Sequence, residues 1–277
     1  MTHHRNHIVC SFLLTLLYFI GYTQNKNLDF QLLFSCKEKA ELINCDKLGY
    51  IYLSNGTNIY KYNQKGEQLC LYSNLKKGKI SNIDTYNPMK ILVFSKDFLQ
   101  LTFLDNYLSP LNFISGNLAD YNLYQPTLIC ASHDNGFWVY DDVAEQLFRF
   151  DYQGKPTNES ISFSQITTEK IIPIQMKESE SGYIIVNDSN SGFFIFDQFG
   201  TYIKQLPIPK IEHFDIYSDL IVYCKEAQLV ALNLNTLNQQ VVSLPQNDIH
   251  IVAIQDNIIV CLNTEGNVSV YLWTPTN

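Results

Sequence analysis

Histidine is the first residue type to examine for acid–base or metal chemistry, because imidazole titrates near neutral pH and is a common metal ligand. Beyond residue 23 the sequence contains three histidines, His133, His213 and His250, which are 80 and 37 residues apart. These spacings form no H-x-x-H or H-E-x-x-H metal motif. We expect His213 and His250 on or near inner strands of two successive repeats, as a candidate two-histidine site in a central channel. The alternative is that they are polar residues lining the channel and bonded to water.

Acidic residues are the second candidate set, because they recur in the turns between the second and third strands of successive repeats. The set comprises Asp97, Asp141, Asp142, Asp188, Glu226 and Glu265. If these turns gather on one face, their carboxylates form an acidic rim that can coordinate a hard cation or attract a basic peptide. The alternative is ordinary turn chemistry, since Asp is favoured in tight turns. If the rim binds a ligand, we expect that changing Asp141, Asp142 and Asp188 to Asn weakens binding without loss of stability.

The elements that must position these residues are read from an internal repeat. An apolar, aromatic-rich run is followed by Asp or Asn, often by Gly, and then by a second strand-like run. The turn residues are Asn63, Asp105, Asp151, Asp197 and Asn233, which are 42, 46, 46 and 36 residues apart. Asp or Asn opens a tight turn and Gly supplies a positive φ, so each instance predicts a hairpin. With two further strand candidates upstream, the unit has four strands, which is typical of a β-propeller blade.

Counting strands predicts how the ring closes. The sixth unit stops after its third strand, and an unassigned strand at residues 30–35 precedes the first unit. Pairing that strand as the outer strand of the last blade covers an otherwise exposed sheet edge. We therefore predict an all-β, six-bladed propeller with four antiparallel strands per blade, as a single domain over residues 24–277. A pair of irregular β-sandwiches is the alternative.

The first 23 residues read as an export signal. A short segment with Arg5 precedes the apolar run of residues 8–21, and polar residues follow from Gln24. The run is shorter than the roughly 20 residues that a membrane-spanning helix needs, so we expect a cleaved signal peptide at 1–23 and no transmembrane segment afterwards; an uncleaved anchor is the alternative. The expected location is the periplasm or cell envelope, or the extracellular space.

Six cysteines remain after that segment, namely Cys36, Cys45, Cys70, Cys130, Cys224 and Cys261. Disulfides can persist in an exported protein, but no pair has C-x-x-C spacing and most of these cysteines interrupt apolar runs. We expect buried free thiols for most of them.

The second repeat carries a resemblance to a known group of proteins. Residues 86–98, YNPMKILVFSKDF, followed by Phe103-Leu104-Asp105-Asn106, are similar to a family of uncharacterised exported proteins of Bacteroidota-type bacteria. That resemblance implies a six-bladed propeller behind a signal peptide, and it transfers no catalytic residue. More generally the repeats look like NHL or YncE propeller repeats, and the Gly-His and Trp-Asp signals of WD40 repeats are absent.

Composition and charge exclude some classes of function. The 277 residues are 46% hydrophobic and hold 19 Lys and Arg against 27 Asp and Glu, a formal net charge of −8. Such a chain folds but lacks the basic surplus that nucleic acid binding requires. No G-x-S-x-G elbow, P-loop, G-x-G-x-x-G or EF-hand loop occurs in the sequence.

We therefore expect an exported, monomeric, non-enzymatic propeller without a cofactor that binds a protein or cell-envelope component. The alternative is a hydrolase or lyase that acts on a glycan or lactone at the central channel.

Overall fold

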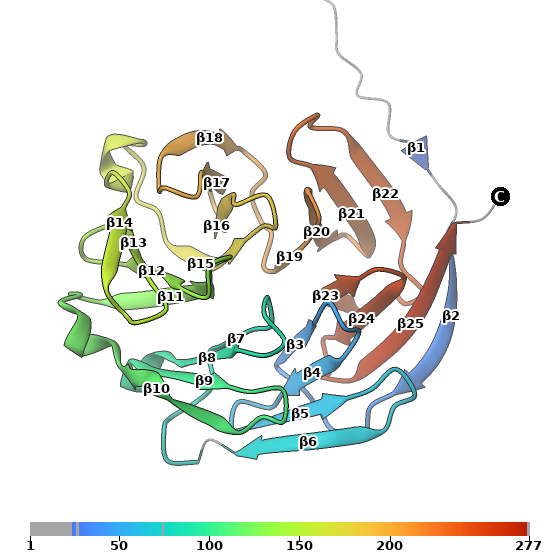
Figure 1. Cartoon of the computed structure of the whole chain (residues 1–277). Coiled ribbons are helices and arrows are strands. Elements are labelled where there is room, and N and C mark those ends of the chain that lie inside the picture. The colour runs from blue at the N-terminus through green and yellow to red at the C-terminus, as the bar shows by residue number, and fades with distance from the viewer. Residues whose placement is uncertain (1–23, 26–27, 74, 276–277) are drawn as a thin grey trace, which may run out of the picture.

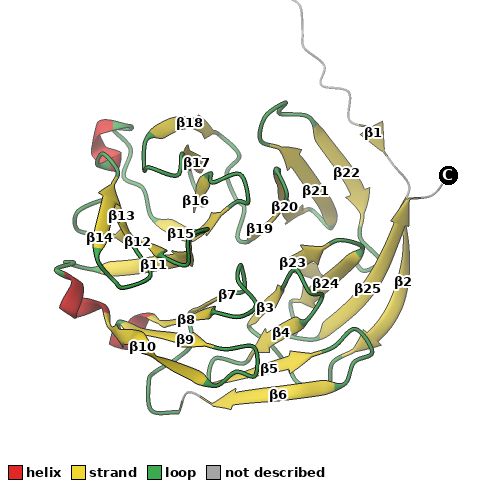
Figure 2. Cartoon of the chain, viewed as in Figure 1, coloured by secondary structure: helices red, strands yellow, loops and turns green. Residues whose placement is uncertain are grey.

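Six antiparallel sheets are arranged around a common axis in the computed structural model, which describes residues 24–25, 28–73 and 75–275 (Figure 1). Each sheet is one blade, and its first strand lies next to the axis. Strands and turns make up nearly all of the described chain, and the helices are short 3₁₀ turns (Figure 2). The predicted six-bladed propeller with four antiparallel strands per blade is confirmed.

The blades follow one another in chain order, and the strands of each are given from the axis outward. Blade 1 holds β3 (Leu42–Cys45), β4 (Ile51–Ser54), β5 (Asn58–Tyr62) and β6 (Gln68–Ser73). Blade 2 holds β7 (Asn82–Asp84), β8 (Ile91–Ser95), β9 (Gln100–Leu104) and β10 (Pro110–Asn117), with η1 (Lys96–Phe98) between β8 and β9. Blade 3 holds β11 (Pro126–Ala131), β12 (Phe137–Asp141), β13 (Gln146–Phe150) and β14 (Pro156–Glu159).

The second half of the ring repeats this order. Blade 4 holds β15 (Pro173–Glu178), β16 (Ile184–Asp188), β17 (Gly192–Phe196) and β18 (Tyr202–Leu206). Blade 5 holds β19 (Phe214–Tyr217), β20 (Leu220–Lys225), β21 (Gln228–Asn233) and β22 (Gln239–Ser243). Blade 6 holds β23 (Ile249–Gln255), β24 (Ile258–Asn263), β25 (Val268–Pro275) and β2 (Leu28–Ser35). The helices η2 (Leu118–Tyr121) and η3 (Phe163–Gln165) join blades 2 and 3 and blades 3 and 4.

Blade 6 closes the ring with strands from both ends of the chain. β2 pairs antiparallel with β25 from Leu28 opposite Pro275 to Ser35 opposite Ser269, and the Cys36 amide donates to the Val268 carbonyl at 2.9 Å. The predicted closure by the N-terminal strand is confirmed, with that strand longer than residues 30–35. A two-residue strand that the sequence did not predict, β1 (Gln24–Asn25), pairs in parallel with β22 at the outer edge of blade 5.

The predicted hairpin turns join the third and fourth strands of blades 1 to 5. In blade 2, Asp105 Oδ1 accepts hydrogen bonds from the amides of Tyr107 and Ser109, both at 2.8 Å. Asn63, Asp151 and Asp197 make the equivalent pair of bonds in blades 1, 3 and 4. The side chain of the turn residue thus accepts hydrogen bonds from two backbone amides of the turn, which explains why Asp or Asn recurs at this position.

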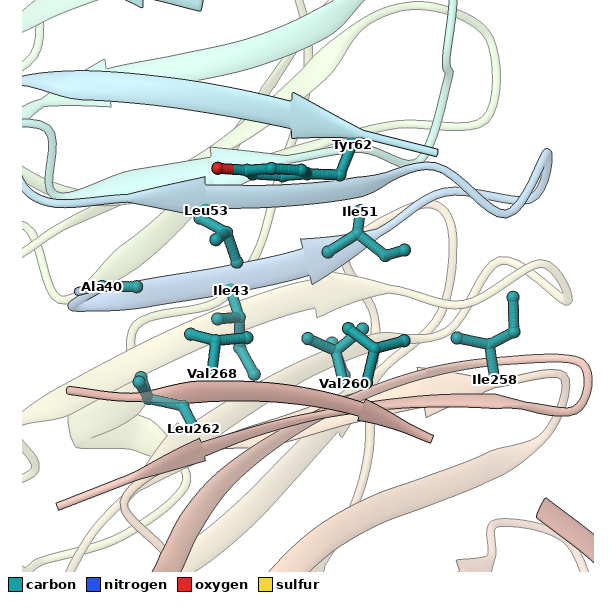
Figure 3. Close-up of a cluster of buried hydrophobic side chains, with 11 residues drawn as sticks. Ala40, Ile43, Ile51, Leu53, Tyr62, Ile258, Val260, Leu262 and Val268 are labelled. Atoms are coloured by element: carbon teal, nitrogen blue, oxygen red, sulfur yellow. The ribbon is translucent and has the colours of Figure 1, made fainter. Parts of the chain in front are cut away.

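The core lies between the faces of neighbouring blades. Between blades 1 and 6, Ile51 and Leu53 of β4 pack towards Val260 and Leu262 of β24 (Figure 3). Central strands such as β8, β12 and β17 are buried at every residue, because a blade packs against a neighbour on each of its faces. Strands buried on both faces appear in sequence as continuous apolar runs rather than as alternating patterns.

Two further expectations concern cysteines and the membrane. The six cysteines after residue 23 are free thiols in the structure, with Cys130 and Cys261 buried and the other four partly buried, whereas burial was expected for most of them. Over the ranges that the structure describes, no helix has both the length and the hydrophobicity that crossing a membrane requires. The expected signal peptide at 1–23 lies outside the described residues.

Candidate functional site

Two cavities lie on the axis of the ring, one at each end of the inner strands. The polar cavity, of about 410 Å³, is lined by residues at and just beyond the ends of these strands, including Asp84, Tyr86, Glu178, Asp215, Tyr217 and Asp256. The apolar cavity, of about 450 Å³, is lined by residues near their starts, including Leu42, Ile83, Ile129, Ile174, Ile251 and His213. Asn44 and Lys177 line both cavities and so lie between them. We call the space occupied by the two cavities the central channel.

Lys177, on β15, is the central charge of the polar cavity. Its ammonium donates to Asp215 Oδ1 of blade 5 at 2.6 Å and to Asn44 Oδ1 of blade 1 at 3.3 Å. Burial alone would lower the pKa of Lys177, but the carboxylates of Asp215 and Asp84 outweigh it, and the pKa lies above its ordinary value. Lys177 is therefore charged at neutral pH, and its charge is compensated inside the ring.

An Asp-x-Tyr sequence at the end of the inner strand occurs in blades 2 and 5, which face each other across the ring. Asp84 Oδ2 accepts the amide of Ala131 from blade 3 at 3.0 Å, and Asp215 Oδ2 accepts the amide of Ile254 from blade 6 at 2.9 Å. Each carboxylate thus links its own blade to the next. Burial raises the pKa of Asp84, although Lys177 and two backbone amides act in the opposite direction.

Glu178 makes a third connection between blades. Its side chain is 0% exposed, and its carboxylate accepts hydrogen bonds from Trp138 Nε1 at 2.8 Å and from the His133 amide at 3.0 Å. It also lies 2.6 Å from His133 Nδ1. These bonds attach β15 of blade 4 to the first hairpin of blade 3. Every oxygen of this carboxylate is therefore engaged by the protein.

The mouth of the polar cavity has a different character, because its acidic side chains are exposed. Glu180 and Asp256 are both exposed, and Tyr86 and Tyr217 stand beside them in the lining. The whole lining holds five carboxylates against the two ammonium groups of Lys47 and Lys177. Acidic and aromatic side chains around one opening attract cations by charge and by contact with the ring faces.

The acidic rim expected from the sequence lies elsewhere. Pairing of Pro126 with Asp141 and of Pro173 with Asp188 puts the turns after the second strands at the start of the inner strands, the end of the ring that holds the apolar cavity. The set divides by exposure into four exposed residues, Asp97, Asp142, Glu226 and Glu265, and two buried ones, Asp141 and Asp188. None of the six lines either channel cavity. Ligand binding by this rim stays a prediction.

Asp141 and Asp188 are held by backbone amides. Asp141 accepts four such bonds, at 2.6 Å from Tyr124, 2.9 Å from Gln125 and 3.0 Å from each of Val143 and Ala144. Asp188 accepts amides from Ile172, Asn190 and Ser191. Because these carboxylates fix the ends of their strands, the structure changes the expectation that both can be neutralised without loss of stability.

The histidines predicted for the channel lie at the same end as the apolar cavity. His213 lines that cavity, and the charge of nearby His250 acts on it. Burial, assisted by the positive charge of Lys177, lowers the pKa of His213 to about 3. His133 lies in the turn of the first hairpin of blade 3. Within residues 24–25, 28–73 and 75–275, no three His, Cys, Asp or Glu side chains are grouped to hold a metal ion.

The inner-strand residues of the polar cavity are not among those predicted from the sequence. A usable signal was present in Asp84-Thr85-Tyr86 and Asp215-Ile216-Tyr217, which repeat one motif at the same place in two blades. Four of the six blades lack it, so a search for a pattern common to all blades does not detect it. Lys177 had no comparable local signal.

The comparisons with known proteins bear on the fold. The sequence matches no protein-family model and no curated protein. The WD40 domain of Neurospora crassa Pan2 is similar in structure, with a TM-score of 0.64 and 10% identity over 90% of this chain and 96% of that one. A streptogramin B lyase gives a TM-score of 0.58 and 11% identity over 90% and 88% of the two chains.

The virginiamycin B lyase of Staphylococcus aureus gives a TM-score of 0.57 and 11% identity over 83% of this chain and 79% of its own. At these identities the likeness shows a shared propeller fold and no shared activity. The resemblance to a WD40 domain without the WD40 sequence signals shows that blade geometry does not depend on them.

Proposed function

We propose that the chain is an exported, non-enzymatic β-propeller that binds a protein or cell-envelope ligand through a basic group placed in the polar cavity. The apolar run before residue 24 and the resemblance of residues 86–98 to exported propellers support export. The observation that carries the binding role is the pair of exposed carboxylates, Glu180 and Asp256, beside Tyr86 and Tyr217 at the mouth of that cavity.

The inner and outer parts of the polar cavity have different tasks. The carboxylates of Asp84, Glu178 and Asp215 already accept hydrogen bonds from other groups of the propeller. These donors are backbone amides, the indole of Trp138 and the ammonium of Lys177. The outer acids are exposed and can meet a cation that enters from solvent. A lysine or arginine side chain, with its charge near these acids and its stem between two tyrosine rings, fits such a mouth.

A second candidate function is an enzyme acting on a glycan or lactone, and Asp84 is the observation that favours it. Its pKa is raised by burial, and perturbed carboxylates are common in active sites. Both of its oxygens, however, accept backbone amides, at 2.9 Å from Tyr86 and at 3.0 Å from Ala131. A carboxylate held in this way is a structural link between blades, so we place the binding role first.

The test measures binding of a fluorescent oligolysine peptide, with an oligoserine peptide as the neutral probe. Changing Glu180 to Gln and Asp256 to Asn should weaken oligolysine binding by roughly tenfold and reduce its dependence on salt, because two charges are lost at the mouth. Oligoserine should bind neither protein.

The matched control neutralises two exposed acids at the opposite end of the ring, Asp97 to Asn and Glu226 to Gln. Oligolysine binding by this control should equal that of the wild type. If the control loses binding and the first variant keeps it, the rim predicted from the sequence is the binding surface. If neither variant differs from the wild type, the proposal of an acidic binding mouth is wrong.

A further inference from the structure

A surface that is both basic and apolar lies on two neighbouring loops at the end of the ring opposite the polar cavity. One loop, residues 75–79, belongs to the connection between blades 1 and 2, and the other is η1, at the end of β8 that pairs with the start of inner strand β7. The loops touch, because a Cβ atom added to Gly78 would collide with the ring of Phe98. We call this surface the basic patch, and it consists of Leu75, Lys76, Lys77, Lys79, Lys96 and Phe98.

The apolar side chains of the basic patch are exposed on a fixed backbone. Leu75 is 79% exposed and Phe98 is 60% exposed. The Lys96 amide donates to Ser81 Oγ at 3.0 Å, which holds the start of η1. The side-chain amide of Asn117 donates to the Phe98 carbonyl at 3.3 Å, which holds its end. The fold therefore presents Phe98 to solvent, and covering the two apolar side chains would release free energy.

The charge of the basic patch is opposite to that of the chain, whose formal net charge is −8. Lys79 forms an ion pair with Glu41 at 2.7 Å. Among the described residues, no carboxylate lies at ion-pair distance from the ammonium of Lys76 or Lys96. Asp97 is exposed on η1, so the two loops and Glu41 together carry four ammonium groups against two carboxylates. The patch thus keeps a positive charge on an acidic protein.

A bilayer that contains anionic lipids matches both properties of the basic patch. Lysines attract anionic head groups, and exposed leucine and phenylalanine side chains enter the boundary between head groups and acyl chains. A free anion would meet the lysines but would leave Leu75 and Phe98 in water.

We propose that the basic patch docks the ring on an anionic lipid surface, with its lysines at the head groups and with Leu75 and Phe98 inserted. The polar cavity lies at the other end of the inner strands, so docking in this way turns its mouth away from the bilayer. The patch shares no residue with that cavity, and the two proposals stand or fall separately.

The first test measures flotation with lipid vesicles. It uses the chain that begins at Gln24, which holds every strand of the ring and lacks the apolar run of residues 8–21 that would bind vesicles by itself. Vesicles of phosphatidylcholine with roughly 30% phosphatidylglycerol should bind it at least about tenfold more tightly than pure phosphatidylcholine, and salt should weaken this binding. Equal binding to both lipids, or binding to neither, would overturn the proposal.

Matched lysine variants locate the surface that binds. Lys76→Gln with Lys96→Gln should weaken binding to the anionic vesicles by roughly tenfold or more, because two charges near the head groups are lost. Lys65→Gln with Lys155→Gln changes two exposed lysines in the turns between third and fourth strands, at the other end of the ring, and should have no effect. Equal losses in the two variants would mean that no particular patch is used.

Insertion is tested on the full chain with brominated lipids, which quench tryptophan on contact. Phe98→Trp and Phe199→Trp change two phenylalanines that are each 60% exposed, and Phe199 lies in a turn between third and fourth strands. After subtraction of the wild-type signal, vesicle binding should quench the added emission of Phe98→Trp and leave that of Phe199→Trp unchanged. Quenching of both, or of neither, would contradict insertion of this patch.

An oligoglutamate peptide tests an acidic protein as the partner instead. Leu75→Ser should weaken vesicle binding, because an inserted apolar side chain is lost. If the chain binds oligoglutamate but no vesicles, the basic patch is a docking site for an acidic protein and the membrane proposal is wrong.

Discussion

Lys177 of blade 4 and Asp215 of blade 5 form an ion pair of 2.6 Å whose side chains are only 17% and 9% exposed. The same ammonium reaches Asn44 of blade 1, which lies on the opposite side of the ring. One side chain therefore ties together blades that are adjacent and blades that are far apart. In a ring built from separate sheets, such a link acts where no strand pairing joins the blades.

Replacing only one member of the ion pair between Lys177 and Asp215 should lower the free energy of unfolding. We expect Asp215→Asn to lower the free energy of unfolding by about 3–5 kcal/mol, because the buried Lys177 ammonium loses its main counter-charge. Lys177→Met should also destabilise, since it leaves Asp215 and Asp84 without a nearby cation. Urea denaturation of the three proteins measures both effects.

The double variant Lys177→Met with Asp215→Asn is the control for this prediction. It should be more stable than the Lys177→Met variant, because the double variant also removes the Asp215 carboxylate that Lys177→Met leaves without a cation, while Asp84 is in the same position in both. Additive losses in the double variant would show that the two side chains stabilise the ring independently.

Two neighbouring aspartates in the turn after β12 should differ sharply. Asp141→Asn is expected to cost about 1–3 kcal/mol, since one oxygen that accepts two backbone amides is replaced by a donor group. Asp142→Asn changes an exposed side chain and should stay within about 0.5 kcal/mol of the wild type. Thermal denaturation distinguishes them, and equal melting temperatures would mean that Asp141 does not hold the strand end.

Closure of the ring can be tested by shortening the chain. A chain that begins at Lys39 lacks β2 and exposes β25 as an unpaired edge, so it should aggregate and melt at a lower temperature. A chain that begins at Leu28 lacks only β1 and should remain monomeric in size-exclusion chromatography. If the chain beginning at Lys39 also stays monomeric and equally stable, pairing of β2 with β25 does not close the ring.

Stability should fall in acid partly because of His213. Its pKa is about 3 in the folded chain, below its ordinary value of 6.5, so the unfolded chain binds more protons between these two values. Stability from this group is present above pH 6.5 and is lost as the pH falls towards 3, by at most about 1.4 kcal/mol per pH unit. The stability of a His213→Phe variant relative to wild type should therefore rise between pH 7 and pH 4; an unchanged difference would contradict the burial of His213 as a neutral ring.

The fold was predictable because its determinants are local. Asp105, Asp151 and Asp197 each accept hydrogen bonds from two backbone amides within the next four residues. Each hairpin is therefore determined by a short stretch of sequence. The pairing of the N-terminal strand with blade 6 could be predicted by counting strands, because the sixth repeat has three strands and the other repeats have four. The start of β2 and the pairing of β1 with β22 could not be counted in this way, because they depend on which edges remain open in space.

The polar cavity was harder to predict because its residues act across blades. Lys177 meets Asn44, which is 133 residues away in the chain, and no short pattern records that contact. Asp141 and Asp188 illustrate the opposite error. An aspartate at a strand end before a turn looks exposed in sequence, but here backbone amides from the preceding connection surround it.

The position of Asn44 and Lys177 between the two cavities affects how far a ligand can extend along the axis of the ring. The polar and apolar cavities lie end to end along the axis, and the side chains of Lys177 and Asn44 line the inner end of each. A molecule in either cavity meets the side chains of Asn44 and Lys177 at its inner end. The reach of any group that enters the polar cavity along the axis is therefore set by the side chains of Lys177 and Asn44.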